Sequence, residues 1–428
     1  MCMLACLAAV PALAQQALTL ESAIARGLEH SARLAELEAR QAGAAAAANG
    51  RAAAKLPTVS AQAGYTRTNH VEEFTIAAPG QPSRVLYPDV PDNYRARIDL
   101  QWPIYTAGRA DALERAARAE VNAAGEDLAA ARADLRLEIT RAFWALVTAG
   151  ETERVLARAL EGLDAHVNDL QSRLTQGLIP PNDVLTAQAQ RARQNVASIE
   201  SANARAIAEA DLRRLIGGSG PLVPIPDADP AAAPPMPGGA GQTAGEAPDR
   251  SERRALDLRL AGARERETAI RATGKPQIFL GGGYDYARPN PRIFPRADRW
   301  ETSWDASITV AWTLWDGGRR GAEQAEAAAA ARAVEARITD FDRQAAFEVE
   351  ARRLDLDSSR AAIAAADQGI RSAVEARRVV GERYRAGVVT STDVLDAEVA
   401  VLQAELDRTR AMAAARLAEA RLTRALGR

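Results

Sequence analysis

The sequence predicts a mainly α-helical protein with a small β part, built from two structural repeats. Residues 95–109 match residues 305–319 at an offset of 319 − 109 = 210, and this register continues without a gap for over a hundred residues. Two stretches, 109–176 and 319–386, contain no proline and are rich in Ala, Arg, Glu and Leu, which is typical of long helices. Short segments that alternate polar and apolar residues precede them, which is typical of strands.

The repeats define the expected order of elements along the chain. A first repeat at 15–217 and a second at 248–428 flank a Pro/Gly-rich linker at 218–247, expected as a loop midway along the helices. Within the repeats we expect four strands, at about 58–68, 94–103, 277–287 and 304–313. Long helices are expected at about 107–176 and 317–386, and return helices at about 181–216 and 391–426.

The return helices are shorter than the long helices, which at 1.5 Å per residue would each reach about 100 Å. We therefore expect an additional helix to continue each return helix end to end. The expected partners are 248–273 for the helix at 181–216, and 18–55 for the helix at 391–426.

The N-terminal residues 1–14 have the pattern of a signal peptide. A short apolar run is followed by Ala12-Leu13-Ala14, a typical small-residue cleavage site. Both cysteines of the chain, Cys2 and Cys6, lie in this segment, so the mature chain has no thiol for a disulfide, a metal or a nucleophile. Lipidation of Cys6 is the alternative, although Met3-Leu4-Ala5 is a poor lipobox.

The expected strands carry most of the aromatic residues. Five of the six Trp and six of the seven Tyr lie in these segments or their loops. In 94–102 the apolar residues share one face and Arg95, Arg97, Asp99 and Gln101 share the other. A soluble antiparallel sheet also shows such alternation. Aromatic clustering and a signal peptide favour a membrane barrel. Four strands cannot close a barrel, which takes about eight or more, so the chain must oligomerise, and three copies would supply twelve strands.

Other classes find little support in the sequence. The net charge is −2 with both signs interspersed, which argues against nucleic acid as a partner. The three histidines, His30, His70 and His166, are isolated and show no metal-ligand spacing. We therefore expect no catalytic residue, no metal site and no cofactor.

Two pairs of motifs resemble the TolC family of outer membrane efflux proteins over essentially the whole mature chain. The first pair is the strand-to-helix junctions WPIYTAGR at 102–109 and LWDGGR at 314–319. The second is the helical turns LTQGLIPPND at 174–183 and YRAGVVTSTDVLD at 384–396. The resemblance implies a trimeric twelve-stranded outer-membrane β-barrel, four strands per chain, continuous with a coiled-coil tunnel in the periplasm. It also implies partnership with a periplasmic adaptor, an inner-membrane pump and outer-membrane lipid.

The resemblance further implies roles for particular residues. The pore gate would comprise Tyr384, whose hydroxyl would tether the neighbouring hairpin, with Asp183 as acceptor, and Asp393, Asp396 and Asn182. Gly177 and Gly387 would contact the adaptor. Because aromatic residues gather in and next to the expected strands, the aromatics at the membrane interface would be Trp102, Tyr105, Trp312 and Trp315.

The gate region also departs from the family, and its residues have a second explanation. Val389 stands where the family's best-known member has a basic residue, so the salt bridge of that gate does not carry over; Arg385 or Arg173 are the possible substitutes. Thr390 and Asp393 form a capping box pattern, and Asp183 lies in the first turn of a helix. Asp396 lies beyond the first turn, where capping does not explain it.

Two functions remain open from the sequence. The first is a passive outer-membrane exit duct of a tripartite efflux or type I secretion system, reaching into the periplasm, with a gated periplasmic entrance. The second is a periplasmic adaptor or coiled-coil scaffold without a pore. Two full repeats favour the duct, because an adaptor would show a single hairpin.

Overall fold

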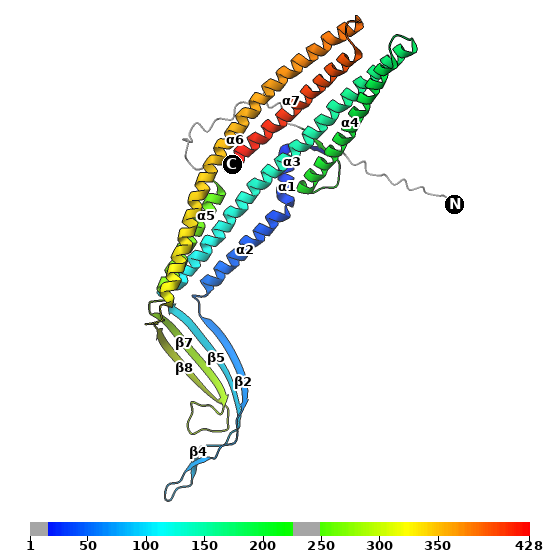
Figure 1. Cartoon of the computed structure of the whole chain (residues 1–428). Helices are drawn as coiled ribbons and strands as arrows, with labels where there is room; N and C mark the ends of the chain where they lie inside the picture. Colours follow the sequence, from blue (N-terminus) through cyan, green and yellow to red (C-terminus); the bar gives the residue numbers. More distant parts are fainter. Residues whose placement is uncertain (1–15, 226–248) are drawn as a thin grey trace, which may run out of the picture. The chain divides into compact units, whose positions relative to one another are not determined.

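The computed structural model describes residues 16–225 and 249–428 (Figure 1). The expected signal peptide at 1–14 and most of the linker at 218–247 lie outside the described residues. The chain divides into two compact units. One contains residues up to 38 together with 126–253 and 339–428, and the other contains 39–125 and 254–338. The helices α3 and α6 contribute residues to both units.

The helical hairpins repeat at the predicted offset. The long helices α3 (Arg109–Thr175) and α6 (Arg319–Arg385) have 67 residues each. Each is followed by a return helix, α4 (Pro181–Ile216) or α7 (Ser391–Ala425), and Figure 1 shows each long helix beside its return helix. These bounds lie within two residues of the predicted ones. Within residues 16–225 and 249–428, none of the helices combines the length and hydropathy needed to cross a membrane.

Three shorter helices continue the hairpins: α1 (Leu20–His30), α2 (Ala32–Ala53) and α5 (Ser251–Ala272). The single helix expected at 18–55 is interrupted at Ser31, whose extended backbone ends α1. The Ser31 hydroxyl then accepts a hydrogen bond from the Leu34 amide at 3.3 Å, which caps the start of α2.

The predicted pairing of the short helices was wrong. The ring of His30 at the end of α1 lies against Gly217 at the end of α4, whereas Arg250 before α5 donates to the Ala425 carbonyl of α7 at 2.7 Å. Helix α1 therefore lies beside the last turn of α4, with α2 following it, and α5 begins where α7 ends. The reason is a strand pair that the sequence did not reveal. Strand β6 (Leu222–Pro224), inside the expected linker, pairs in parallel with β1 (Gln16–Leu18) and brings α1 to the end of α4.

The largest hydrophobic core lies around this strand pair. Phe143, Ile139 and Leu146 of α3 are fully buried against α1 and α4, together with Leu18 and Leu222. At roughly 25 cal/mol per Å² of buried apolar surface, such residues supply most of the local stability. A smaller core of Leu356, Ala418 and Leu422 joins α6 to α7.

The second unit contains a four-stranded antiparallel sheet in the order β2-β5-β7-β8. Its strands are β2 (Thr58–Arg67), β5 (Asp92–Tyr105), β7 (Gln277–Arg288) and β8 (Glu301–Ala311). Strand β8 begins three residues before the predicted position, because Glu301 still pairs with Ala287 of β7. The loop between β2 and β5 contains a further hairpin, β3 (Phe74–Ile76) and β4 (Arg84–Tyr87).

The register places different chemistry on the two faces of this sheet. Cross-strand partners share a face, and Arg97 pairs with Gln62 and Asp285 while Ile98 pairs with Ala61 and Tyr284. One face, called here the polar face, carries Thr58, Ser60, Gln62, Thr66, Asn93, Arg95, Arg97, Asp99, Gln101, Asp285, Glu301, Ser303, Asp305 and Ser307. The other, the apolar face, carries Val59, Ala61, Tyr65, Tyr94, Ile98, Leu100, Trp102, Leu280, Tyr284, Trp304, Ile308 and Val310.

Candidate functional site

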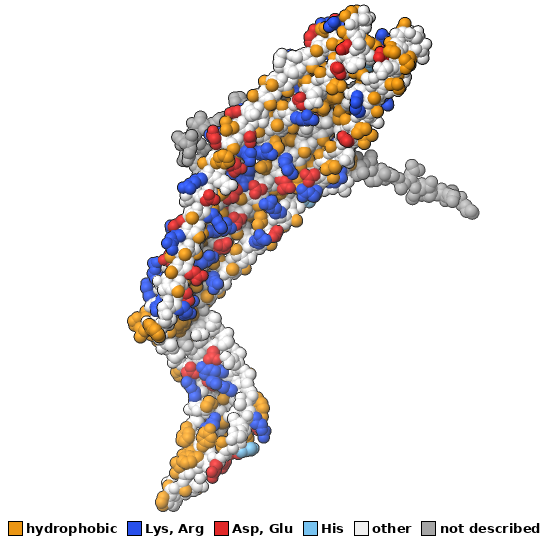
Figure 2. All heavy atoms as spheres, in the orientation of Figure 1, with side chains coloured by type: hydrophobic (Ala, Val, Ile, Leu, Met, Phe, Trp, Pro, Cys, Tyr) orange, Lys and Arg blue, Asp and Glu red, His pale blue; other side chains and the backbone are white. Residues whose placement is uncertain are grey.

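The tips of the two helical hairpins share a small hydrophobic cluster. It contains Leu163, Val167 and Leu170 of α3, Val184 and Ala187 of α4, and Leu395 of α7, with Tyr384 of α6 packed at its edge. Residues from all four helices of the two hairpins therefore meet here. Figure 2 shows charged side chains of both signs interspersed over the helices.

Tyr384 lies between the hairpins but does not make the predicted tether. Its ring stacks under the guanidinium of Arg173, which lies 5.1 Å from the ring centroid, and faces the ring of His166 at 6.2 Å. Among the described residues, its hydroxyl donates no hydrogen bond to Asp183. Burial raises the pKa of Tyr384, so the hydroxyl stays protonated at neutral pH. Within the chain, a cation–π contact with Arg173 takes the place of the expected hydrogen bond.

His166 was not predicted from the sequence as a site residue. Its Nε2 lies 3.1 Å from the hydroxyl of the buried Ser391, the first residue of α7, and this contact joins α3 to the second hairpin. Burial lowers the pKa of His166, so the ring is neutral at neutral pH. Ser391 lies 225 residues away in the sequence, and only the fold brings it to His166.

The acidic residues proposed for the gate have different surroundings. The carboxylate of Asp393 accepts hydrogen bonds from the amide and the hydroxyl of Thr390, both at 2.7 Å, which confirms the predicted capping box. These bonds hold the pKa of Asp393 below its usual range. Asp183 is half-buried in the first turn of α4, where its charge complements the helix dipole. Asn182 and Asp396 are exposed.

Gly177 and Gly387 end the long helices with equivalent geometry. Their φ angles are 71° and 72°, a left-handed conformation that favours glycine. In each turn the next amide bonds back to the helix, from Leu178 to the Arg173 carbonyl and from Val388 to the Arg383 carbonyl, both at 2.9 Å. An added Cβ at either glycine would meet no atom of the chain within 4 Å, so both turns present open surface.

Two of the four predicted interface aromatics also hold the sheet to the helices that precede it. The indole Nε1 of Trp102 donates to the Lys55 carbonyl, and that of Trp312 donates to the Gly274 carbonyl, both at 3.1 Å. These carbonyls lie just beyond α2 and α5, so the same bond occurs once in each repeat. Tyr105 and Trp315 are exposed, Trp315 by 85%.

A second aromatic cluster, not singled out from the sequence, lies at the opposite end of the strands. Tyr94 contacts Tyr65 at 5.0 Å, and Trp300 stacks on Tyr286 with ring centroids 4.7 Å apart. Tyr94 and Trp102 are eight residues apart on β5, or about 27 Å at 3.4 Å per residue. The length of the apolar face between the two aromatic ends therefore nearly equals the height of the apolar band of an outer-membrane barrel, which is roughly 25 Å.

No group of His, Cys, Asp and Glu side chains within 16–225 and 249–428 is arranged to hold a metal ion. The candidate site consists instead of the sheet with its polar and apolar faces, the aromatic residues at both ends of its strands, and the tips of the two helical hairpins. Together these features define the class of a membrane channel subunit with long helices attached to its strands.

Comparison with known proteins identifies the family. The outer membrane efflux protein family model matches residues 23–218 and 250–428, which is most of the chain. The chain therefore belongs to the outer membrane efflux protein family. Protein CyaE of Bordetella pertussis is 27% identical over 390 residues, covering 84% of this chain and 78% of that protein.

Solved structures share the fold at low identity. CusC, described in work on folding and transmembrane channel formation, matches with a TM-score of 0.84 at 16% identity, covering 95% of this chain and 92% of that chain. VceC from Vibrio cholerae has a TM-score of 0.78 at 20% identity, and the match covers 95% of this chain and 96% of that chain. The MtrE outer membrane channel of Neisseria gonorrhoeae, in its open state, has a TM-score of 0.75 at 21% identity. The match covers 95% of this chain and 88% of that chain.

These matches confirm the predicted fold class, mainly α-helical with a small β part and two repeats. The protein is an outer membrane efflux protein. The alternative of a pore-less adaptor or scaffold is not supported, because the family match includes both repeats and the strands between their helices.

The capping box generates a pH-dependent prediction. Because the pKa of Asp393 in the folded state lies below the ordinary value of about 3.9, its charge stabilises the start of α7 above that pH. This contribution is lost as the pH falls through the lower folded-state pKa. Thr390→Ala should cost about 1 kcal/mol and reduce amide hydrogen-exchange protection in the first turn of α7 at neutral pH.

In the wild type the same protection factors should fall only below about pH 4. In the variant this fall should be smaller, because the hydroxyl is lost while the amide of residue 390 still donates to Asp393. Thr392→Ala, at the exposed neighbouring threonine, serves as the control. Equal protection in Thr390→Ala and the control would contradict a stabilising role for the capping box.

Proposed function

We propose that three copies of this chain form a passive exit duct, which conducts substrates from an inner-membrane pump and a periplasmic adaptor to the exterior. The observation that carries the proposal is the sheet with a polar face, an apolar face and two edges, β2 and β8. In hydrocarbon, unpaired backbone groups cost several kcal/mol each, so such edges need partners. Pairing β8 of one copy with β2 of the next in a ring of three would give twelve strands from four per chain.

The faces of the sheet support the placement of this ring in lipid. The apolar face, with its aromatic ends, would contact outer-membrane lipid, with Trp102, Tyr105, Trp312 and Trp315 at the periplasmic boundary. The polar face would line an aqueous lumen. The duct would supply walls for transport and no catalytic group, and the pump would supply the energy.

The helical surface supports the same oligomer. Leu185, Val196, Ile199 and Ile207 of α4 are all exposed, and their spacing places them on one side of that helix. Exposed apolar side chains in a row on a long helix are typical of a helix-to-helix interface. In a ring of three copies, this row would pack against a neighbouring copy and continue the barrel as a helical tunnel.

The hairpin tips would form the periplasmic entrance. In the trimer, Tyr384, Asn182, Asp183, Asp393 and Asp396 would each occur three times around the mouth. Asp396 is the strongest candidate for the lumen, because it is exposed and takes no part in the capping box. Arg173 occupies the position beside Tyr384, which supports it as the basic residue that replaces the one missing at Val389.

The two turns are the proposed adaptor contacts. Gly177 and Gly387 present open backbone in equivalent conformations, so six near-identical turns in a trimer would match repeated copies of an adaptor tip. A larger residue at either glycine would meet no atom of the chain but would strain the left-handed backbone. The relevant cargo, whether small molecules or secreted polypeptides, would be selected by the pump.

A charge placed in the α4 row should prevent assembly. Ile199 is 63% exposed in the single chain, so Ile199→Glu leaves the fold of one copy intact but would bury a carboxylate in the trimer. We expect heat-modifiable trimers to disappear from detergent-extracted outer membranes, while Ile199→Leu retains them. Trimers at wild-type abundance in Ile199→Glu would exclude this row from the interface.

Removal of the Asp396 charge should weaken cation binding at the entrance. Three carboxylates at a narrow mouth attract cations strongly, so Asp396→Asn should reduce the block of single-channel current by divalent cations about tenfold or more in planar bilayers. Glu382→Gln, an exposed residue that pairs with Arg378 on its own helix, is the matched control. Block that is unchanged in Asp396→Asn would place Asp396 outside the lumen.

A further inference from the structure

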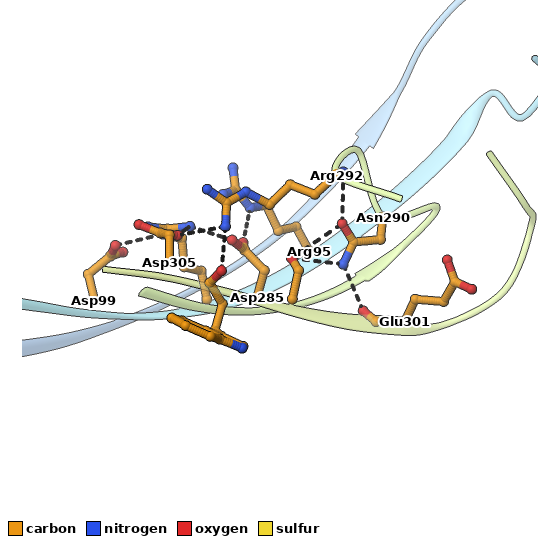
Figure 3. Close-up of polar contacts among 10 residues, drawn as sticks. Arg95, Asp99, Asp285, Asn290, Arg292, Glu301 and Asp305 are labelled. Carbon is orange, nitrogen blue, oxygen red and sulfur yellow. Dashed lines mark hydrogen bonds and ion pairs between the residues drawn. The ribbon is translucent and has the colours of Figure 1, made fainter. Parts of the chain in front are cut away.

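The polar face of the sheet is covered at one end by the chain itself. Asp285 of β7 and Asn290 of the following loop are only 2% and 1% exposed, although the polar face otherwise carries side chains suited to water. Asp285 forms ion pairs with two arginines of β5, with Arg95 at 2.6 Å and with Arg97. Figure 3 shows Arg95 and Asp285 beside Asn290 and Arg292 of the following loop.

The loop between β7 and β8, residues 289–300, is fixed to the polar face by its first residues. The amide of Asn290 donates to the Ser303 hydroxyl and to the Glu301 carbonyl, both at 3.1 Å, and Ser303 belongs to the polar face. The side chain of Asn290 also accepts a hydrogen bond from the Arg292 amide at 3.0 Å, which sets the direction in which the loop continues. All polar atoms of this buried amide are thereby satisfied by the strand and the loop.

Arg292 extends the charge network of the strands into the loop. Its guanidinium donates to the Trp304 carbonyl at 2.7 Å and lies 3.3 Å from the carboxylate of Asp305. Asp305 also pairs with Arg97 at 3.1 Å. A hydrogen bond from a charged group is stronger than one between neutral groups. Arg292 therefore holds the loop to the polar face of the sheet more firmly than Asn290 alone would.

The middle of the loop reaches across towards the first repeat. Arg296 lies 4.9 Å from the ring centroid of Tyr87 in β4, and its amide donates to the Leu86 carbonyl at 3.3 Å. Between the loop and the polar face of the sheet lies an open cleft of about 320 Å³, lined by Pro289, Pro291, Arg296, Gln62, Arg95 and Arg97. The loop therefore lies over the polar face and does not project away from the strand ends.

The connectivity places this loop at the outer end of the sheet. Helices α2 and α5 lead into β2 and β7, and α3 and α6 follow β5 and β8, so every helix joins the same end. The loops at 68–91 and 289–300 lie at the other end, which faces the exterior if the helices extend into the periplasm.

We infer that the β7–β8 loop, anchored by Asn290 and Arg292, is an inward-folded restriction at the outer mouth of the barrel. This inference rests on the proposed channel, in which the polar face lines the lumen. Three such loops would narrow the exit and determine how large a molecule can enter from outside. The restriction is separate from the entrance at the helical tips, because no residue is common to both.

A cysteine reporter tests the restriction from the outside. The only cysteines of the chain are Cys2 and Cys6, so Ser60→Cys introduces a thiol on the polar face of β2, nearer the helical end than the loop. Intact cells are treated with a small maleimide or with a maleimide attached to a long polyethylene glycol chain. In the Asn290→Ala/Arg292→Ala background we expect labelling by the bulky reagent to accelerate on the order of tenfold, with the small reagent unchanged.

The controls separate the possible outcomes. Arg299→Ala removes an arginine of the same loop that is exposed and pairs only locally, with Glu301, and should leave both rates unchanged. A bulky-reagent rate in the double variant equal to that in Arg299→Ala would overturn the inference and leave the channel intact. A Ser60→Cys thiol that even the small reagent never reaches, while lipid-facing Val59→Cys reacts, would contradict the lumen itself and the inference with it. Replacement of 292–299 by two glycines gives the same readout if the double variant does not assemble.

Discussion

The hydrogen-bonding of backbone groups in lipid is the constraint on which the rest of the molecule depends. Four antiparallel strands satisfy one another internally and leave the outer edges of β2 and β8 for another chain. The sheet has an apolar face that ends in aromatic residues and a polar face with charged groups. A sheet of this kind is stable in a membrane only as part of a closed ring, so the oligomer is a requirement of the fold.

The second consequence of this constraint is the need to join a sheet firmly to helices. Trp102 and Trp312 each donate to a carbonyl just beyond the preceding helix, and the bonds have the same length in both repeats. Each indole is placed where an interface aromatic is expected and also satisfies a carbonyl at a helix end. The indoles that we propose for lipid contact therefore also fix the chain where the sheet joins the helices, in both repeats.

Much of the fold was predictable because the same order of elements occurs in both sequence repeats. The bounds of α3, α4, α6 and α7 followed from proline-free stretches and from the glycine turns, and the capping box followed from the spacing of Thr390 and Asp393. Contacts that depend on pairs distant in sequence were not predictable. Strands β1 and β6 have three residues each, too few to show a period, yet their pairing brings α1 beside the end of α4.

The candidate sites show the same division. The interface aromatics were predicted from the aromatic residues gathered in and next to the strands, whereas Trp300 lies in a loop and joins the second aromatic cluster only through folding. His166 and Ser391, 225 residues apart, gave no signal in the sequence. The expected tether from Tyr384 to Asp183 was taken from the family and does not occur within the chain, where Arg173 occupies that side of the ring. Features that depend on residues close together in the sequence could thus be predicted from it, whereas contacts between distant residues could not.

The central claim is that three chains close one barrel with their polar faces inward. Electron cryo-microscopy of the wild-type protein, extracted from outer membranes into lipid nanodiscs, tests it most directly. The account predicts a threefold-symmetric particle with twelve strands, in which Arg97 and Asp285 face the lumen and Ile98 and Tyr284 face the lipid. A particle with another symmetry, or a barrel with Ile98 and Tyr284 on the inside, would contradict it.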